Sequence, residues 1–321
     1  MLPSSTEVKT PPTEVSGLPP RTLTVLPLSA AQQNLRSEGS SISYPAVTET
    51  TLVTGWYPLK STVRIHQSIK NLCKLPKALV IFTTEVYALE LLQYRKNYLN
   101  ATQIIVRPFE SFAMTCPSMM SLWDGQWLLD PSRNKNTPES YALAAMKQEF
   151  MRIVTNHNRF QSKWFVWCDP GLFSYSALLG YSMSFPSEIE RLCLAGRMTF
   201  LEVSMIPESY ILDREEGKPL EYPIAVQHLG GDCIVGDAAA WQEFGEAYKE
   251  MLKEFVLRGW FAGKDTDVYF AMLMEKTVPP YRLFHATAFG QEREVVEGIE
   301  WFSLAPMLAG TIDAPLDTRF E

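Results

Sequence analysis

The chain lacks the short motifs that identify several common nucleotide-binding and hydrolytic enzymes. Its 321 residues contain no Gly-x-Gly-x-x-Gly after the first predicted strand, where Thr54-Gly55-Trp56-Tyr57 carries a single glycine. A phosphate-binding P-loop and a Gly-x-Ser-x-Gly nucleophile elbow are also absent from the sequence. These absences argue against a Rossmann dehydrogenase, a P-loop NTPase and an α/β-hydrolase.

Cysteine pairs at metal-binding or redox spacing are missing as well. The five cysteines include no Cys-x-x-Cys pair, and the four histidines do not cluster with them in the sequence. Cys168 and Cys233 lie within apolar runs, which predicts buried, reduced thiols. A structural zinc site built on cysteine is therefore disfavoured.

The sequence has neither a long apolar run nor an excess of positive charge. No run approaches the roughly 20 apolar residues that span a bilayer, and the N-terminus lacks the regions of a secretory signal. We therefore expect no membrane span in this chain and favour a cytoplasmic location. The net charge of −7 and the pI of about 5.3 argue against a nucleic-acid partner.

The composition changes along the chain and predicts one folded domain between two tails. Residues 1–47 are rich in Pro, Ser, Thr and Glu, which predicts a disordered tail. Residues 48–312 are expected to form a single α/β domain, and residues 313–321 a short C-terminal tail.

Within the predicted domain, β-rich runs alternate with segments of helical periodicity. This rhythm predicts parallel strands joined by right-handed crossovers, in a mixed but mostly parallel sheet flanked by helices. The stretch 107–136 shows no clean period and is expected to be irregular. Predicted strands cover residues 50–54, 77–84, 103–106, 164–168, 200–204, 224–236 with a glycine break, and 282–285. Predicted helices cover residues 61–72, 85–98, 137–154, 187–195, 237–259 and 268–276.

The segment Trp164 to Cys168 is the most informative of these strands. Its five apolar residues indicate a strand buried on both faces, and Asp169-Pro170-Gly171 follow directly. A carboxylate at the carboxyl end of such a strand lies where open α/β sheets bind ligands. The alternative is that Asp169 only forms the turn that ends the strand.

Three short segments follow one another within this order of elements. They are Asn136-Thr137-Pro138 with Lys147, Trp167-Cys168-Asp169-Pro170-Gly171, and His228-Leu229-Gly230-Gly231 with Gly236. On these segments and the order of elements, the chain resembles the GT-A fold of nucleotide-sugar glycosyltransferases and, more narrowly, the HtrL/YibB family of bacterial proteins, over roughly Thr50 to His285. The resemblance implies transfer of a sugar from a nucleotide-sugar donor to an acceptor, a glycan or another molecule, that the sequence does not identify.

The resemblance also implies a divalent cation. In GT-A enzymes an Asp-x-Asp at a strand end coordinates Mn²⁺ or Mg²⁺, and the metal holds the donor diphosphate. Here Asp169 stands in that place. His285 is the expected second metal ligand, and the alternative is that it is an ordinary hydrogen-bonded histidine at a strand end. Positions 167 and 171 are Trp and Gly, so the usual second carboxylate is absent and metal dependence is an open question.

The resemblance places two acidic residues near the reacting sugar. Asp267, or alternatively Asp265, is expected to act as a general base on the acceptor hydroxyl. The competing interpretation is that one of them caps the helix that follows. Further residues are expected to contact the donor, although each also has an ordinary structural explanation; these are Thr54, Gly55, Tyr57, Arg64, Lys147, Asp169, Gly230 and Gly231.

A non-catalytic GT-A-like module that binds a glycan or a protein is the alternative function. The missing second carboxylate favours it. The two functions differ in a measurable property, because only an enzyme loses donor turnover when Asp169 is replaced.

Overall fold

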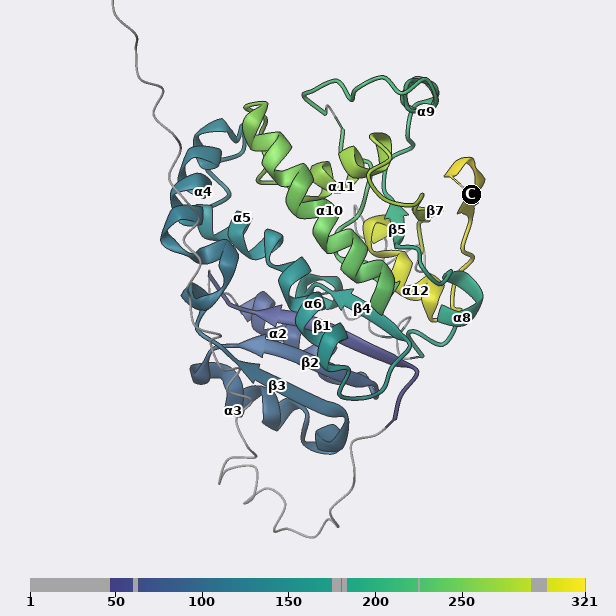
Figure 1. The fold of residues 1–321 in the computed structure, drawn as a ribbon. Helices are drawn as coiled ribbons and strands as arrows, with labels where there is room; N and C mark the ends of the chain where they lie inside the picture. Colours follow the sequence, from purple (N-terminus) through teal and green to yellow (C-terminus); the bar gives the residue numbers. More distant parts are fainter. Residues whose placement is uncertain are drawn as a thin grey trace, which may run out of the picture.

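An eight-stranded mixed sheet forms the centre of the computed structural model, with helices on both faces (Figure 1). The structure describes residues 47–59, 63–174, 180, 184–224, 226–289 and 299–320, and the side chains of residues 63–65 are not described. The predicted disordered tail thus lies outside the described residues, apart from Val47. The strands are β1 (Thr50–Trp56), β2 (Ala78–Thr83), β3 (Thr102–Val106), β4 (Trp164–Cys168), β5 (Thr199–Glu202), β6 (Cys233–Asp237), β7 (Arg282–His285) and β8 (Leu316–Asp317).

The strand order is β3-β2-β1-β4-β6-β5-β7-β8. Parallel pairing joins β3 to β2, β2 to β1, β1 to β4 and β5 to β7. Strand β6 runs antiparallel to both β4 and β5, and β8 runs antiparallel to β7. The predicted fold class, a mixed and mostly parallel sheet flanked by helices, is confirmed.

The helices cover the sheet as two layers over two apolar cores. One core packs the sheet against α4, α5, α6, α10 and α11, and the other packs it against α2, α3, α8 and α12. Among the described residues, no helix is both long and apolar enough to cross a membrane. The helices are α2 (Val63–Leu72), α3 (Glu85–Tyr94), α4 (Pro117–Leu129), α5 (Pro138–Ala145), α6 (Lys147–His157), α8 (Ile189–Leu192), α9 (Glu208–Glu215), α10 (Ala238–Leu257), α11 (Asp265–Met274) and α12 (Leu304–Leu308).

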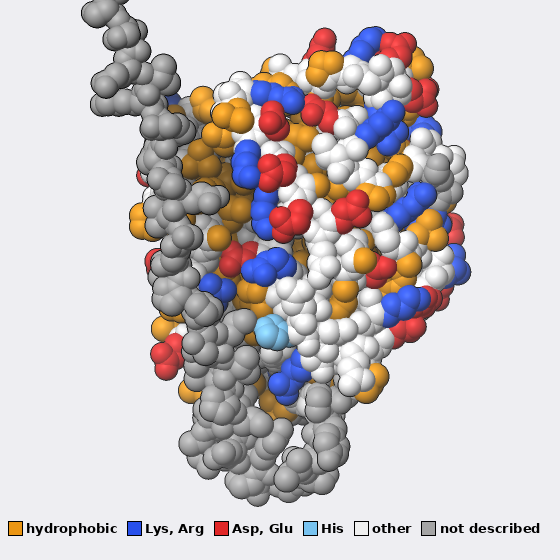
Figure 2. Space-filling model, in the orientation of Figure 1, with side chains coloured by type: hydrophobic (Ala, Val, Ile, Leu, Met, Phe, Trp, Pro, Cys, Tyr) orange, Lys and Arg blue, Asp and Glu red, His pale blue; other side chains and the backbone are white. Residues whose placement is uncertain are grey.

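Helix α10 follows its sequence pattern closely. Asp237 is the N-cap and accepts a hydrogen bond from the Ala240 amide at 2.8 Å, and Gly259 adopts a positive φ of 71° just after the last turn. The outer face carries acidic and basic side chains in pairs three residues apart, including Glu246 with Lys249 (Figure 2). On the inner face, aromatic side chains at three- and four-residue steps form a stripe that is buried in the core; these are Trp241, Phe244, Tyr248 and Phe255.

The sequence prediction was wrong about the helices in two segments. The stretch 107–136 contains the 13-residue helix α4, whose apolar residues are spread around the helix and leave no period to detect. The single helix predicted over 137–154 is two helices, because the chain turns at Met146 between α5 and α6. This turn places Lys147 at the start of α6.

The C-terminal segment predicted as a tail contains the last strand. Leu316 and Asp317 pair with β7, and Thr318–Phe320 form a 3-10 helix. Asp317 and Phe320 are both buried. Residues 316–320 therefore contribute to the sheet edge and to the core.

Candidate active site

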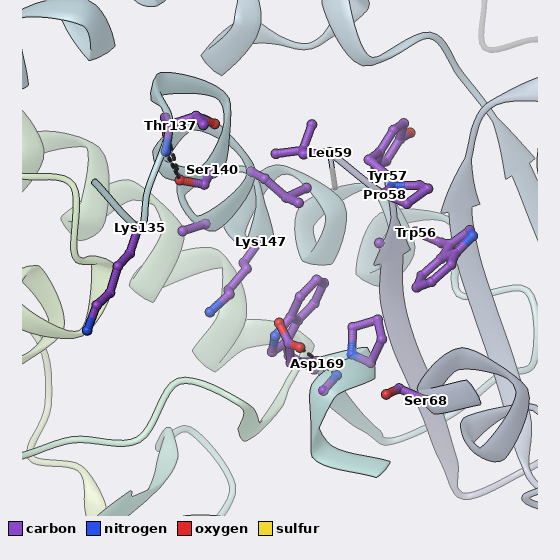
Figure 3. A pocket seen from close by; sticks show the side chains of 16 residues that line it. Trp56, Tyr57, Pro58, Leu59, Ser68, Lys135, Thr137, Ser140, Lys147 and Asp169 are labelled. Carbon is purple, nitrogen blue, oxygen red and sulfur yellow. Dashed lines mark hydrogen bonds between the residues drawn. The ribbon is translucent and has the colours of Figure 1, made fainter. Parts of the chain in front are cut away.

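A cavity of about 390 Å³ opens at the carboxyl ends of β1 and β4. The chain passes from β1 outward to β2 and β3 and then returns to place β4 on the other side of β1. Such a reversal of strand order leaves a crevice outside the strand ends, where open α/β sheets bind ligands. Figure 3 shows Lys147 and Asp169 among the side chains that line this cavity, with the Lys147 side chain extending toward Asp169. Its lining is Gly55, Trp56, Tyr57, Pro58, Leu59, Ser68, Lys135, Thr137, Ser140, Leu143, Ala144, Lys147, Trp167, Asp169, Pro170 and Gly171.

Asp169 both forms the turn after β4 and lines the cavity. Its Oδ1 accepts a hydrogen bond from the Gly171 amide at 2.8 Å, which begins a 3-10 turn at Pro170. In the part of the chain that the structure describes, Oδ2 has no hydrogen bond. The two interpretations of this carboxylate are therefore compatible, because one oxygen holds the turn and the other is available to a ligand.

Lys147 is a buried cation at the centre of the site, with 7% of its surface exposed. Its Nζ lies 2.7 Å from Oδ2 of Asp265 and donates a hydrogen bond to the Gly231 carbonyl at 3.0 Å. Burial alone would lower the pKa of Lys147, but the carboxylates of Asp265 and Asp169 raise it above its ordinary value. Lys147 is therefore positively charged at neutral pH.

Asp232 places a second carboxylate beside Asp169. Cys168 pairs with Cys233 in the β4–β6 ladder, and the Asp169 amide donates to the Asp232 carbonyl at 2.7 Å. The two aspartates thus lie opposite each other just beyond the paired ends of antiparallel strands, where opposite side chains share one face of the sheet. Burial and the Asp169 carboxylate raise the pKa of Asp232 to about 7, against the opposing effect of Lys147.

The two candidate catalytic carboxylates lie in the first turn of α11. Neither caps the helix, since Lys264 is the N-cap residue and the cap has no side-chain hydrogen bond. Asp265 pairs with Lys147 and accepts a hydrogen bond from the Tyr269 hydroxyl at 2.9 Å. Asp267 is 5% exposed, and the described residues offer its carboxylate no hydrogen bond. Burial raises the pKa of Asp267 to about 6, with Lys264 opposing and Asp265 adding to the shift.

A chain of hydrogen bonds fixes Asp265 from behind. The Gln148 amide donates to the Tyr269 hydroxyl at 2.9 Å, and that hydroxyl donates to Asp265. Helices α6 and α11 are thereby joined through buried polar groups, with Lys147 at one end of the chain. Each link restricts the orientation of the next side chain, although Oε1 of Gln148 is buried without a partner in the described part of the chain.

Gly231 is required by close packing around Lys147. A Cβ at this position would lie 2.9 Å from Cγ2 of Thr266 and 3.2 Å from Nζ of Lys147. A Cβ at Gly230 would meet Val203 at 3.3 Å, which is a milder contact. Gly231 therefore lets the chain before β6 approach the start of α11, and Gly230 lets it approach β5.

The structure places the remaining predicted donor contacts in different surroundings. The Thr54 side chain is fully buried on the sheet face away from Lys147, since it follows the alternation of Leu52. Gly55 lines the cavity. The Tyr57 hydroxyl donates to the Arg107 carbonyl at 3.1 Å, and its ring stacks on Phe150 in the core.

Arg64 lies in α2, and its side chain is outside the described part of the chain. Tyr57 contributes to the cavity wall, but its ring is packed among other aromatic rings and is not free to stack on a ligand.

His285 lies in a separate cluster from Asp169. It contacts Oε2 of Glu202, and the possible ligand atoms of Glu202, His285 and Asp317 all lie within 4.8 Å of one another. Within the described residues, this is the one group of three or more metal-ligand side chains so arranged, and Asp169 is not in it. The structure therefore does not bring the two predicted metal ligands together.

Sequence reasoning missed Asp232, Glu202 and Asp317. Asp232 follows the glycine pair directly, so its position before a strand was visible in the sequence. Its place opposite Asp169 was not visible, because that depends on β6 running antiparallel between β4 and β5. Glu202 lies within a predicted strand, whereas Asp317 falls in the segment predicted as a tail.

No protein-family model matches the chain, and no curated protein matches it. Among solved structures, the apo form of mouse xyloside xylosyltransferase 1 is similar over 71% of this chain and 81% of that chain. The sequence identity is 10% and the TM-score is 0.36.

Proposed function

We propose that this protein is a glycosyltransferase that moves a sugar from a nucleotide-sugar donor to an acceptor hydroxyl. The observation that carries the proposal is the cavity at the reversal of strand order, where the Asp169 carboxylate and the buried Lys147 cation meet. The finer assignment to the HtrL/YibB family belongs to the same proposal and rests on the sequence resemblance.

In this proposal, Lys147 and a divalent cation both bind the diphosphate of the donor. The side chains fit a cation, because Asp169, Asp232 and Asp265 surround a single ammonium group and leave an excess of negative charge. Asp169 and Asp232 would hold Mn²⁺ or Mg²⁺, whose preferred ligands are carboxylate oxygens and phosphates. The cation would supply neutralisation of the charge that develops on the leaving diphosphate.

Asp267 is the better of the two candidate bases. Asp265 already pairs with Lys147 and Tyr269, whereas Asp267 has a pKa of about 6 and no hydrogen-bonding partner among the described residues. In an inverting reaction, the acceptor oxygen bonds to the anomeric carbon and its proton passes to Asp267. The bond from that carbon to the diphosphate oxygen breaks, and the nucleotide leaves with the electron pair.

Donor binding tests the proposal directly. The melting temperature would be measured with a panel of UDP- and GDP-sugars, with and without Mn²⁺. We expect at least one donor to raise it, and Asp169→Asn to abolish that shift. Asp213→Asn is the matched control, because Asp213 forms an exposed ion pair with Lys218. No shift with any donor in the wild-type protein would contradict the proposal.

A non-catalytic binding module is the second candidate. The replacement of the usual second carboxylate by Trp167 and Gly171 favours it. Donor turnover that is present in the wild-type protein and lost in Asp169→Ala would eliminate this candidate. Binding of a donor without turnover in any acceptor mixture would support it.

A further inference from the structure

Three neighbouring strands bring acidic and imidazole side chains together, away from the cavity. Glu202 ends β5, His285 ends β7, and Asp317 lies in β8. Strands β5, β7 and β8 are adjacent in the sheet. The possible ligand atoms of the three side chains lie within 4.8 Å of one another.

The hydrogen bonds in this cluster leave free lone pairs at a common point. Oε1 of Glu202 accepts from the Ile206 amide at 2.7 Å and from Arg319 at 3.1 Å. Oε2 of Glu202 is buried and has no hydrogen-bond partner in the described part of the chain, although it contacts Nδ1 of His285. The imidazole of His285 therefore contacts Glu202 through Nδ1, and an oxygen with this one contact keeps a lone pair for a further ligand.

Asp317 is held in the same way by Arg319. Its Oδ1 accepts from the Arg319 amide at 3.0 Å and from Nε at 2.8 Å, while Oδ2 accepts one bond from the described residues, at 2.8 Å from Nη2 of Arg319. Since a carboxylate oxygen can accept two bonds, Oδ2 keeps one lone pair. One atom of each of Glu202, Asp317 and His285 thus remains available to a cation.

The net charge of the cluster also favours a bound cation. Two carboxylates and one guanidinium leave a net charge of −1 when His285 is neutral. The side chain of Glu202 is fully buried and that of Asp317 is 2% exposed, so the solvent stabilises this negative charge very little. A buried excess charge is stabilised by a bound cation or by a proton.

We propose that Glu202, His285 and Asp317 form a zinc site that is separate from the donor site. One imidazole nitrogen and two carboxylate oxygens are a ligand set that zinc accepts, with water in the fourth position. Arg319 orients both carboxylates from outside the metal, as hydrogen-bonded outer groups commonly do. The His285 side chain is 37% exposed and gives the ion access from solvent.

The zinc site ties β8 to β5 and β7 at the edge of the sheet. It involves none of the five cysteines, which are all free thiols elsewhere in the structure. The inference is independent of the proposed glycosyltransferase activity, because it uses none of the residues that line the cavity.

Metal binding without donor or acceptor tests the site. The full-length protein would be stripped with a chelator, dialysed and titrated with Zn²⁺, and with Co²⁺ to follow the absorption of the bound ion. To remove metal binding at the donor site, the same titrations would be made on the Asp169→Asn, Asp232→Asn double variant. We expect one Zn²⁺ per chain in this variant and no competition from millimolar Mg²⁺.

His285→Ala on the same background should bind Zn²⁺ at least about 100-fold more weakly. His157→Ala, at the exposed end of α6, is the matched control and should bind as before. Glu202→Gln is a second test if circular dichroism shows that it folds. Absence of stoichiometric Zn²⁺ in the unmutated protein, or unchanged affinity in His285→Ala, would overturn the proposal.

Discussion

At the scale of single residues, the pKa of Asp267 sets an expected pH dependence of activity. Its pKa is raised to about 6, first by burial, and a general base must be deprotonated to accept a proton. We therefore expect kcat to rise with pH through about 6 and then to level off. Asp267→Asn should lower kcat by about 10²–10⁴-fold. A kcat that is flat between pH 5 and 7.5 would argue against this role.

The pKa of Asp267 also predicts how the free energy of unfolding changes with pH, and this change has the opposite sign. Between the ordinary value of 3.8 and about 6, folded Asp267 binds more protons than the unfolded chain does. Its contribution to the free energy of unfolding therefore falls as pH rises through this window. Asp267→Asn should stabilise the protein at pH 7 by at most about 3 kcal/mol, measured by urea denaturation. Asp213→Asn should leave the free energy of unfolding unchanged, and destabilisation by Asp267→Asn would refute the prediction.

Gly231 offers a steric test of the same site. Gly231→Ala forces a Cβ against Thr266 and Lys147, so we expect it to lower the free energy of unfolding by about 1–3 kcal/mol. It should also weaken donor binding, because Lys147 must move. Gly125→Ala is the matched control, since it lies in α4 with nothing within 4 Å of an added Cβ. The control should be neutral or stabilising by about 0.5–1 kcal/mol.

At the scale of elements, Tyr269 joins α6 to α11. Tyr269→Phe removes the hydroxyl that links Gln148 to Asp265, which should lower the free energy of unfolding by about 1–3 kcal/mol. Because Asp265 is then held only by Lys147, donor affinity should fall as well. Tyr281→Phe also loses one buried hydrogen bond, to the Tyr269 carbonyl, and should keep donor affinity. Equal donor affinity in the two variants would show that the chain of hydrogen bonds does not position Asp265.

The elements that the sequence predicted well are those whose pattern is decided locally. Strand β4 is an apolar run buried on both faces, and α10 has a cap, a stripe and a terminal glycine. Helix α4 escaped prediction because its apolar residues surround it, with Leu122, Trp127 and Leu128 on three different sides. The turn at Met146 was also missed, since the apolar spacing continues across it. Local patterns of this kind carry no information about which strand lies beside which.

At the scale of the whole molecule, the strand arrangement decides which residues meet. Strand β6 runs antiparallel to both β4 and β5, and β7 runs parallel to β5, so the carboxyl ends of β4, β5 and β7 all lie at the same end of the sheet. Asp169, Glu202 and His285 are therefore at that end, as the sequence order suggested. Strand β6 separates β4 from β5, which explains why His285 meets Glu202 and not Asp169. The sequence order predicted that these residues share one end of the sheet, but it could not predict their division into two clusters.

The C-terminal segment provides a final test of how the molecule is held together. If residues 313–321 were a tail, deleting them would change the free energy of unfolding by no more than about 0.5 kcal/mol. The deletion instead removes Arg319, which binds the buried carboxylate of Glu202, and Phe320, which is 2% exposed in the core. Leaving a buried charge without its partner costs about 3–5 kcal/mol, so we expect a loss of at least that size in urea denaturation. Arg319→Ala in the full-length chain should reproduce the part of the loss that comes from the ion pair. Arg159→Ala, with its exposed side chain, should reproduce none of it.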